Sequence, residues 1–294
     1  MTLRQLRAFV TVAECGGFAA ASRQLHVTPS ALSLLVKELE GVMEVRLFDR
    51  TTRRLAPTAA GAEFLPLARN LLADLVRAVD GTRDLEQQKR GAIRVACTPL
   101  YAATLMPGLI RKYRERYAAI TIYVLDSLNE EALNRVLAGE ADLAIAPQRK
   151  TPPILVQEHL LADRMWFVCR PDHVLASRSR VTWTQVLREP FVSLTRDFTA
   201  QLQSDLARRD AGLLLQPAHS VSYITTALGM VQSGFGVTAQ PESALKLLDP
   251  FGLVARPIVA PVVHRQLSLF FRADREPGAA AQSFRAFLRM SLGG

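Results

Sequence analysis

One stretch near the start of the chain constrains the fold more than any other, because it reads as two short helices joined by a tight turn. Residues 18–25 have a helical pattern in which Ala20 and Ala21 leave room for a crossing helix. His26 and Val27 supply the turn, and a second helix follows. This layout predicts a helix-turn-helix unit, whose second helix typically enters the major groove of duplex DNA.

The second helix has a marked start and two different faces. Thr28 is expected at the N-cap, with Pro29 at the first helical position, where a missing N–H has no helical partner to lose. Helical spacing predicts a buried face made of Leu32, Val36 and Leu39. The opposite face is expected to meet a groove, and the DNA contacts predicted on this helix are Pro29, Ser30, Ser33, Leu34 and Lys37.

Two adjacent leucines stand out on the second helix. Leu34 and Leu35 lie beside Ser30 and Ser33 in helical projection, so both are expected to be exposed. An exposed leucine offers a base pair only apolar contact, for example with a thymine methyl group. The alternative is that one of them turns inward and widens the core, which suits Leu35 better than Leu34.

A basic ribbon follows the helix pair. Between residues 46 and 54 the chain carries four arginines against the single acid Asp49, within a chain of formal charge +9. A charge run is usually a solvated face, but beside such a helix pair it is expected to meet phosphates. The ribbon residues predicted to bind DNA are Arg50, Arg53 and Arg54.

Residues 3–61 closely resemble the N-terminal domain of LysR-type transcriptional regulators. The residues that carry the resemblance fall in the family's order: Leu6, Phe9 and Val10, Ala31-Leu32-Ser33, Leu39-Glu40, Leu47-Phe48-Asp49-Arg50, and Leu55-Ala56-Pro57-Thr58 before Ala60-Gly61. The resemblance implies a winged helix-turn-helix domain at 1–57 that binds double-stranded promoter or operator DNA. It also implies a homodimer or a homotetramer built as a dimer of dimers, with RNA polymerase as a further partner.

After Thr58 the chain reads as one long helix. Its apolar residues alternate steps of three and four, which predicts a seam for a partner helix; they are Leu65, Ala68, Leu72, Leu75 and Val79. The family resemblance makes this helix the linker through which two subunits pair, and the alternative is a helix packed on its own domain. Gly81 and the polar residues up to Gly91 predict a hinge, so residues 58–90 are expected to form the linker and dimerisation segment.

From Ile93 onwards short apolar strands alternate with helices, which predicts an α/β fold with parallel strands. Strands are expected at 93–97, 120–125, 143–146, 165–169, 191–194, 216–221, 237–239 and 267–271. Ser127 with Glu130, and Thr182 with Gln185, have the spacing of capping boxes.

This pattern resembles the effector-binding domain of the same family, which is similar to periplasmic solute-binding proteins. The resemblance implies a domain at 91–294 with two crossings near Asp163 and Val262. Half-domain I is expected at 91–162 and 263–294, with the last strand and helix returning to it, and half-domain II at 163–262.

Open parallel sheets bind ligands outside the carboxyl ends of their strands. That rule selects six effector-binding residues: Thr98, Ser127, Pro147, Ser193, Thr195 and Ser222. The effector cleft of the family lies in the same place. Hydroxyls and N–H groups at helix starts suit a small organic acid. Ser127 and Ser222 fit equally well as plain helix caps, and Arg196 is a candidate counter-charge.

The sequence predicts no catalytic residue, cofactor or metal site. Gly234 to Ala239 matches a dinucleotide fingerprint on paper, but here a helix precedes it and a strand follows, which is the reverse of the required order. The stretch instead resembles a glycine turn of the family, with Gln240 in place of the apolar residue usual before Pro241. A solute-binding or enzymatic α/β domain with a DNA-binding appendage remains the alternative.

Cysteine usage and the N-terminus favour a reduced, cytoplasmic protein. Cys15, Cys97 and Cys169 are widely separated and match no metal spacing, so they are expected to be plain thiols. A redox-sensing regulator is the alternative. Arg4 and Arg7 interrupt the first apolar residues, so neither a signal peptide nor a membrane span is expected.

Overall fold

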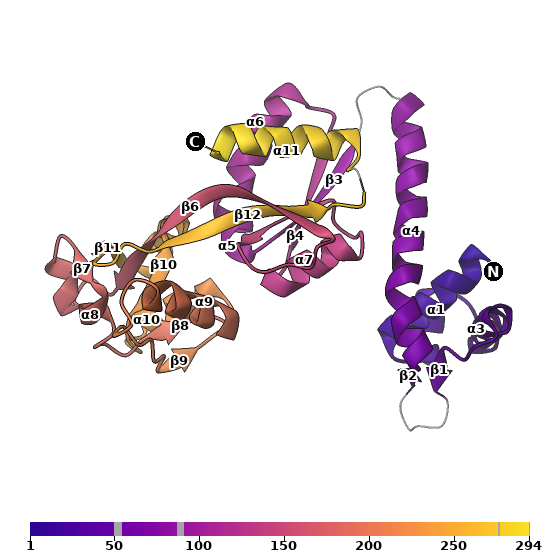
Figure 1. The fold of residues 1–294 in the computed structure, drawn as a ribbon, viewed down its shortest axis with the longest axis horizontal. Coiled ribbons are helices and arrows are strands. Elements are labelled where there is room, and N and C mark those ends of the chain that lie inside the picture. The colour runs from indigo at the N-terminus through magenta and orange to yellow at the C-terminus, as the bar shows by residue number, and fades with distance from the viewer. Residues whose placement is uncertain (50–54, 87–90, 276, 294) are drawn as a thin grey trace. The chain divides into compact units, whose positions relative to one another are not determined.

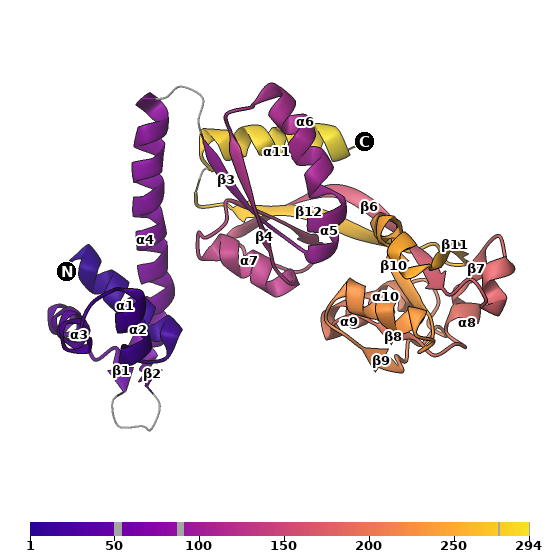
Figure 2. The same cartoon turned by 180° about the vertical axis from the view of Figure 1, so that it is seen from behind.

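A computed structural model of the chain describes residues 1–49, 55–86, 91–275 and 277–293, with the backbone alone described at 73–74 and 76–86. These residues divide into two compact units, one of residues 1–91 with 137–140 and one of the remainder of 92–294. Figures 1 and 2 show the helices and strands of each unit from opposite sides. Each unit has a hydrophobic core of its own.

The first unit is a winged helix-turn-helix fold followed by a long helix. Its elements are α1 (Leu3–Cys15), α2 (Phe18–Gln24), α3 (Pro29–Met43), β1 (Phe48–Asp49), β2 (Ala56–Pro57) and α4 (Ala59–Glu86). The predicted helix pair is confirmed, and its turn contains His26 with a positive φ of 54°. β1 and β2 pair antiparallel, with Phe48 opposite Pro57. The ribbon between them, including Arg50, Arg53 and Arg54, lies outside the described residues.

The core of this unit fixes α3, the base of the ribbon and α4 together. The ring of Phe9 lies 5.4 Å from that of Phe48 and 5.5 Å from that of Phe64, centroid to centroid. Glu40 at the end of α3 accepts hydrogen bonds from the backbone N–H groups of Leu47 and Phe48, at 2.8 and 3.2 Å. A Cβ at Gly61 would lie 2.1 Å from the backbone oxygen of Leu47, so close approach of α4 requires glycine there.

The predicted seam on α4 faces the core of its own unit. Ala68 is fully buried there, and Leu65 and Leu72 pack partly buried against the same residues. These three side chains of the predicted seam therefore pack within their own unit, as the alternative expected; Leu75 is half-buried, and the side chain of Val79 lies outside the described residues. Among the described side chains of α4, Leu67 and Leu71 are the large apolar ones that are exposed. The helix also continues through Gly81 to Glu86, into the predicted hinge, and residues 87–90 of that hinge lie outside the described residues.

The second unit consists of two α/β halves that share two long antiparallel strands. β6 (Leu155–Cys169) and β12 (His264–Arg272) run from one half into the other, as Figure 1 shows. Asp163 on β6 stands opposite Arg265 on β12, so the two strands are paired close to the predicted crossings near Asp163 and Val262. The strand predicted at 165–169 is only the end of β6, which begins ten residues earlier.

The first half has three neighbouring parallel strands in the order β4, β3 and β5, followed by antiparallel β12. Its elements besides β6 and β12 are β3 (Ala92–Cys97), α5 (Pro99–Thr104), α6 (Met106–Arg116), β4 (Thr121–Asp126), α7 (Asn129–Leu137), β5 (Leu143–Pro147) and α11 (Ala279–Leu292). The short helix α5 was not predicted. The return of the C-terminal strand and helix is confirmed, because β12 pairs with β5 and Phe284 of α11 packs on Tyr113 of α6.

The second half has shorter strands and more 3-10 turns than the first half. Its elements are β7 (Val181–Thr182), α8 (Trp183–Val186), β8 (Val192–Ser193), α9 (Arg196–Ala207), β9 (His219–Ser220), α10 (Ile224–Gln232), β10 (Thr238–Pro241) and β11 (Val254–Val259), with 3-10 turns at Val174–Ser177, Glu242–Leu247 and Asp249–Phe251. The capping box of Thr182 and Gln185 is confirmed. Between α10 and β10, Gly236 has φ 130°, and a Cβ there would lie 2.0 Å from the carbonyl oxygen of Pro190.

Candidate functional site

The outer face of α3 is the first candidate surface. Thr28 caps the helix as predicted, because its hydroxyl accepts a hydrogen bond from the N–H of Ala31 at 3.2 Å. The predicted inner face is also confirmed: Leu32, Val36 and Leu39 are fully buried. On the other side Pro29, Ser30 and Lys37 are exposed and Ser33 is half-buried. The helix therefore presents a mixed polar and apolar surface to solvent.

The two leucines of α3 behave differently. Leu34 has 56% of its surface exposed, whereas Leu35 packs partly buried against the core of the unit. Leu34 is therefore exposed as expected, and for Leu35 the alternative, a side chain that turns inward, is the one realised. The reason is the rotation of about 100° per residue along a helix, which brings position 35 towards the side that carries Leu32 and Leu39.

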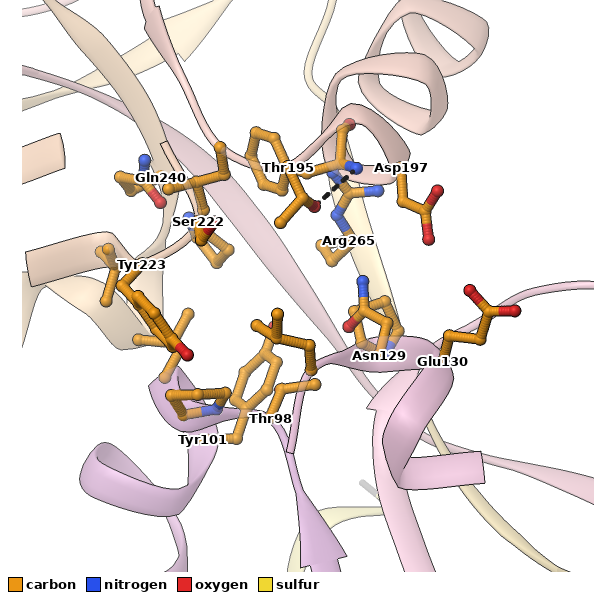
Figure 3. Close-up of a pocket in the computed structure, with 18 of the residues that line it drawn as sticks. Thr98, Tyr101, Asn129, Glu130, Thr195, Asp197, Ser222, Tyr223, Gln240 and Arg265 are labelled. Atoms are coloured by element: carbon orange, nitrogen blue, oxygen red, sulfur yellow. Dashed lines mark hydrogen bonds between the residues drawn. The ribbon is translucent and has the colours of Figure 1, made fainter. Parts of the chain in front are cut away.

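A cavity of about 330 Å³ lies between the two halves of the second unit and is the second candidate site. Four of its lining residues stand at helix starts: Thr98 before α5, Asn129 at the start of α7, Thr195 before α9 and Tyr223 before α10. Figure 3 shows side chains from both halves around this space. Much of the remaining wall is apolar, made of Pro99, Leu100, Leu128, Leu194, Phe198, Ile224 and Pro241.

Four of the six residues predicted from the strand ends line this cavity, namely Thr98, Pro147, Thr195 and Ser222. Ser127 and Ser193 do not, because both are buried with their hydroxyls engaged inside the fold. Ser127 donates to the carbonyl of Leu125 at 3.2 Å and accepts from Arg135 at 2.8 Å. The Ser193 hydroxyl lies 2.6 Å from that of Thr199.

The capping box predicted for Ser127 and Glu130 is wrong, since α7 begins at Asn129. The strand-end rule thus selects the correct loops. It does not determine which way each side chain points.

Sequence reasoning missed the buried cation of the cavity. Arg265 on β12 lines the cavity and is only 5% exposed. Its guanidinium lies over the ring of Phe198 at 4.6 Å and donates to the carbonyl oxygen of that residue at 3.4 Å. The nearest carboxylate, that of Asp205, is 4.0 Å away. Burial lowers the pKa of Arg265, and Asp205 opposes that effect. The available signal was an arginine two residues before the predicted apolar strand 267–271, because β12 begins earlier, at His264.

The other charged residues that line the cavity are exposed to solvent. Arg196, the predicted counter-charge, lines the cavity but is exposed. Asp197 and Glu130 are exposed lining acids, and Asp197 pairs with Arg149 at 3.4 Å. Arg265 is therefore the charged lining group that water screens least.

A buried amide and a buried phenol complete the floor. Gln240 is fully buried and donates from Nε2 to the hydroxyl of Thr238 at 2.9 Å. Tyr101 is also buried, and burial, followed by the neighbouring Asp163 carboxylate, raises the pKa of its phenol well above the usual range. Burial likewise raises the pKa of Asp163, whose Oδ1 accepts from the backbone N–H of Ser243 at 3.2 Å.

The three cysteines are not arranged as a redox pair. Cys97 and Cys169 are fully buried in the cores of different halves of the second unit. Burial raises the pKa of the Cys97 thiol far above its usual range and that of Cys169 to about 11. Cys15, on the first unit, is half-buried. A thiol with a raised pKa forms little thiolate, which is the reactive form, so the redox alternative gains no support.

The part of the chain that the structure describes holds no cluster of three or more metal-ligating side chains. None of its described helices is long and apolar enough to cross a membrane. As predicted, Gly234 and Gly236 follow a helix and precede a strand, which is not the order of a dinucleotide fingerprint.

Comparisons with known proteins cover nearly all of the chain. A family model described as the LysR substrate binding domain matches residues 86–293, and one described as a bacterial regulatory helix-turn-helix protein, lysR family, matches residues 3–62. The chain is 31% identical to the uncharacterized HTH-type transcriptional regulator YfeR of Shigella flexneri, over 96% of this chain and 91% of that protein. It is 29% identical to the nitrogen assimilation regulatory protein nac of Klebsiella aerogenes, over 98% and 94% of the two chains.

Solved structures show the same fold. CbnR, a LysR family transcriptional regulator, matches with a TM-score of 0.80 at 22% identity, over 99% of both chains. Full-length CbnR complexed with its target DNA matches with a TM-score of 0.78 at 23% identity, over 99% of this chain and all of that one.

Proposed function

The chain belongs to the LysR family of bacterial regulators, and we propose that a small organic acid, bound between the halves of its second unit, controls its sequence-specific binding to promoter or operator DNA. Members of this family are DNA-binding transcriptional regulators with an effector-binding domain, and they are not enzymes. The proposal therefore concerns the ligand, the residues that contact it, the DNA contacts and the assembly.

The proposed DNA surface is the outer face of α3 together with the ribbon. Pro29 and Ser30 stand exposed at the start of α3, where the positive end of the helix dipole favours phosphates. Ser33, Leu34 and Lys37 follow along the same side and reach into the major groove. The ribbon arginines Arg50, Arg53 and Arg54 contribute contacts to phosphates or the minor groove.

The observation that carries the effector proposal is a buried, incompletely neutralised arginine in a cavity surrounded by helix starts. Arg265 has its nearest carboxylate at 4.0 Å, which is the outer limit of an ion pair. An anion in contact with the Arg265 guanidinium would accept its hydrogen bonds and neutralise its charge, in a region from which water is largely excluded. Thr98, Thr195 and Ser222 supply hydroxyls around the same space, and Pro147 supplies wall.

The regulator acts as a homo-oligomer in this proposal. Half-sites on a two-fold symmetric operator require at least a dimer, and the family commonly forms a dimer of dimers. The linker of residues 58–90 pairs two subunits through the exposed side of α4, which carries Leu67 and Leu71, because Leu65 and Ala68 are already used within the unit. A protein that meets operator DNA and RNA polymerase works in the cytoplasm.

Binding to duplexes selected from a random pool, followed by fluorescence anisotropy over a range of salt concentrations, tests the DNA part. Replacing both Arg53 and Arg54 with alanine should weaken binding to all sequences. It should also reduce the slope of log K against log salt by about 0.9 for each phosphate that the variant no longer neutralises. A slope identical to that of the unmodified protein would refute the role given to the ribbon.

A thermal-shift screen of small organic acids tests the effector part. An acid at about 100 times its dissociation constant should stabilise the unit that binds it by about 2.7 kcal/mol. The methyl ester of the same acid is the matched control. Equal stabilisation by acid and ester would contradict a carboxylate site.

A further inference from the structure

Gln240 presents a buried acceptor to the cavity, and the orientation of its amide is fixed by its neighbours. The hydroxyl of Thr238 donates to the carbonyl of Val192 at 2.7 Å, so towards Gln240 it can only accept. The group that faces Thr238 at 2.9 Å is therefore Nε2. Oε1 is left as the other end of the amide, and among the described residues this buried oxygen has no hydrogen-bond partner.

A buried acceptor without a hydrogen bond costs folding free energy, and this one lies at the wall of the cavity. Gln240 lines the cavity, and Figure 3 shows its oxygen turned towards the side of Ser222 while its nitrogen turns away. Thr98, across the same space, also has a buried hydroxyl that no described residue satisfies. Groups of this kind are normally hydrogen-bonded in native proteins, so the exceptions point to a missing partner.

The cavity therefore has two chemically different ends. Arg265 can only donate hydrogen bonds and carries a positive charge, whereas Oε1 of Gln240 can only accept. In Figure 3 these two side chains lie apart, with Ser222 and Thr195 between them. Apolar side chains such as Leu100, Phe198 and Ile224 line the rest of a space of about 330 Å³, a volume suited to one small organic molecule.

We propose that the cavity selects carboxylic acids that carry a hydrogen-bond donor at their other end, with the carboxylate on Arg265 and the donor, a hydroxyl or an amino group, on Oε1 of Gln240. This inference rests on the proposed effector function and specifies its ligand class. It also accounts for the sequence departure at position 240, where a polar residue stands in place of an apolar one. Gln240 is then a specificity-determining residue, and Arg265 the anchor that acids of both kinds share.

Matched pairs of acids test the inference on the full chain. The probes are benzoate against its 2-, 3- and 4-hydroxy derivatives, and hexanoate against 6-hydroxyhexanoate and 6-aminohexanoate, with methyl esters as uncharged controls. Affinity is measured by isothermal titration calorimetry. In each series at least one donor-bearing acid should bind about tenfold or more tightly than its parent, because the parent leaves Oε1 unpaired.

Two substitutions separate the two ends of the cavity. Gln240→Leu should remove the preference for the donor-bearing acid while leaving the parent acid bound, whereas Arg265→Met should weaken all acids about tenfold or more and remove the discrimination against the esters. Gln216→Leu and Arg178→Met, at exposed positions, are the matched controls and should change neither. Circular dichroism of each variant checks the fold, and Gln240→Met replaces Gln240→Leu if that variant is unfolded.

The outcomes distinguish this inference from the function it rests on. If acids bind equally with and without a donor, or if the preference survives in Gln240→Leu, the assignment of Gln240 is wrong while an acid effector stands. If no acid in the panel binds, both the ligand class and the acid effector fail, and DNA binding measured separately is unaffected.

Discussion

The outer face of α3 and the cavity of the second unit hold their polar groups in opposite ways. On α3 Ser30 and Lys37 are exposed on one continuous helix, whereas in the cavity Gln240 and Arg265 are buried on strands from different parts of the chain. An exposed group exchanges water for a ligand with little net gain, but a buried unpaired group gains most of a hydrogen bond. DNA affinity should therefore be spread over charge and shape, and ligand selectivity concentrated in a few side chains.

The largest expected effects come from two glycines, one in each unit. A Cβ at Gly236 meets the Pro190 oxygen at 2.0 Å with φ at 130°, and one at Gly61 meets the Leu47 oxygen at 2.1 Å. Gly236→Ala and Gly61→Ala should each lower the free energy of unfolding of their own unit by about 2–4 kcal/mol. Calorimetry measures the loss. Hydrogen exchange should locate the first in the second unit and the second in the first unit.

The two glycine variants also test whether the two units fold and function independently. Gly61→Ala should weaken DNA binding while the cavity keeps its ligand affinity, and Gly236→Ala should weaken ligand binding while the DNA affinity is kept. Simultaneous loss of both activities in either variant would show that the two units fold as one.

The next largest effects are expected from arginine substitutions at the two adjacent leucines of α3. Leu35→Arg should cost about 1–3 kcal/mol of stability, because it places a charge against the core of the first unit. Leu34→Arg should leave stability nearly unchanged and tighten binding to non-cognate duplexes through a new phosphate contact, thereby narrowing the ratio of specific to non-specific affinity. Anisotropy on both classes of duplex measures that ratio. Unfolding of Leu34→Arg would mean that Leu34 belongs to the core.

The smallest expected effect is on the pH dependence of stability, and it comes from the buried carboxylate of Asp163 beside Tyr101. Because burial raises the pKa of Asp163, the folded chain holds that proton more tightly than the unfolded chain. The resulting stability is present at low pH and is lost as pH rises from about 4 through the pKa of the folded state. Asp163→Asn, which keeps an acceptor for the N–H of Ser243, should lose less stability than the unmodified chain between about pH 4 and pH 7. Denaturant titrations with parallel pH profiles would contradict the buried carboxylate.

The same contrast explains what could be predicted from the sequence. The start of α3 at Thr28, its inner face and the box at Thr182 depend on neighbours within four residues, and the structure confirms them. The inner side of α4 was misassigned because Ala68 and Leu72 meet α1 and the rest of the first unit, which periodicity alone does not distinguish from a second subunit. The predicted strand covered only the end of β6, because the 15 residues of β6 run through the cores of both halves.

The cavity was predicted only in outline. The rule for strand ends located Thr98, Pro147, Thr195 and Ser222, since it depends on topology. It failed for Ser127 and Ser193, whose hydroxyls were captured by Arg135 and Thr199. Arg265 was missed, and Gln240 was noted only as a departure from the family pattern. Their roles depend on contacts with other side chains, including the Phe198 ring and the Thr238 hydroxyl, which fix their orientations.

The central claim is that the cavity and α3 are separate sites joined by coupling, and one titration tests it most directly. Anisotropy of a selected operator duplex is measured with and without a bound acid, for the unmodified chain and for Thr98→Val, which removes a buried hydroxyl of the cavity. The acid should change the DNA affinity of the unmodified chain by about 5–150-fold, and in Thr98→Val that change should vanish while the ligand-free affinity stays the same. Equal loss of ligand-free affinity and response in a folded Thr98→Val protein, or no effect of a bound acid on the unmodified chain, would contradict the claim.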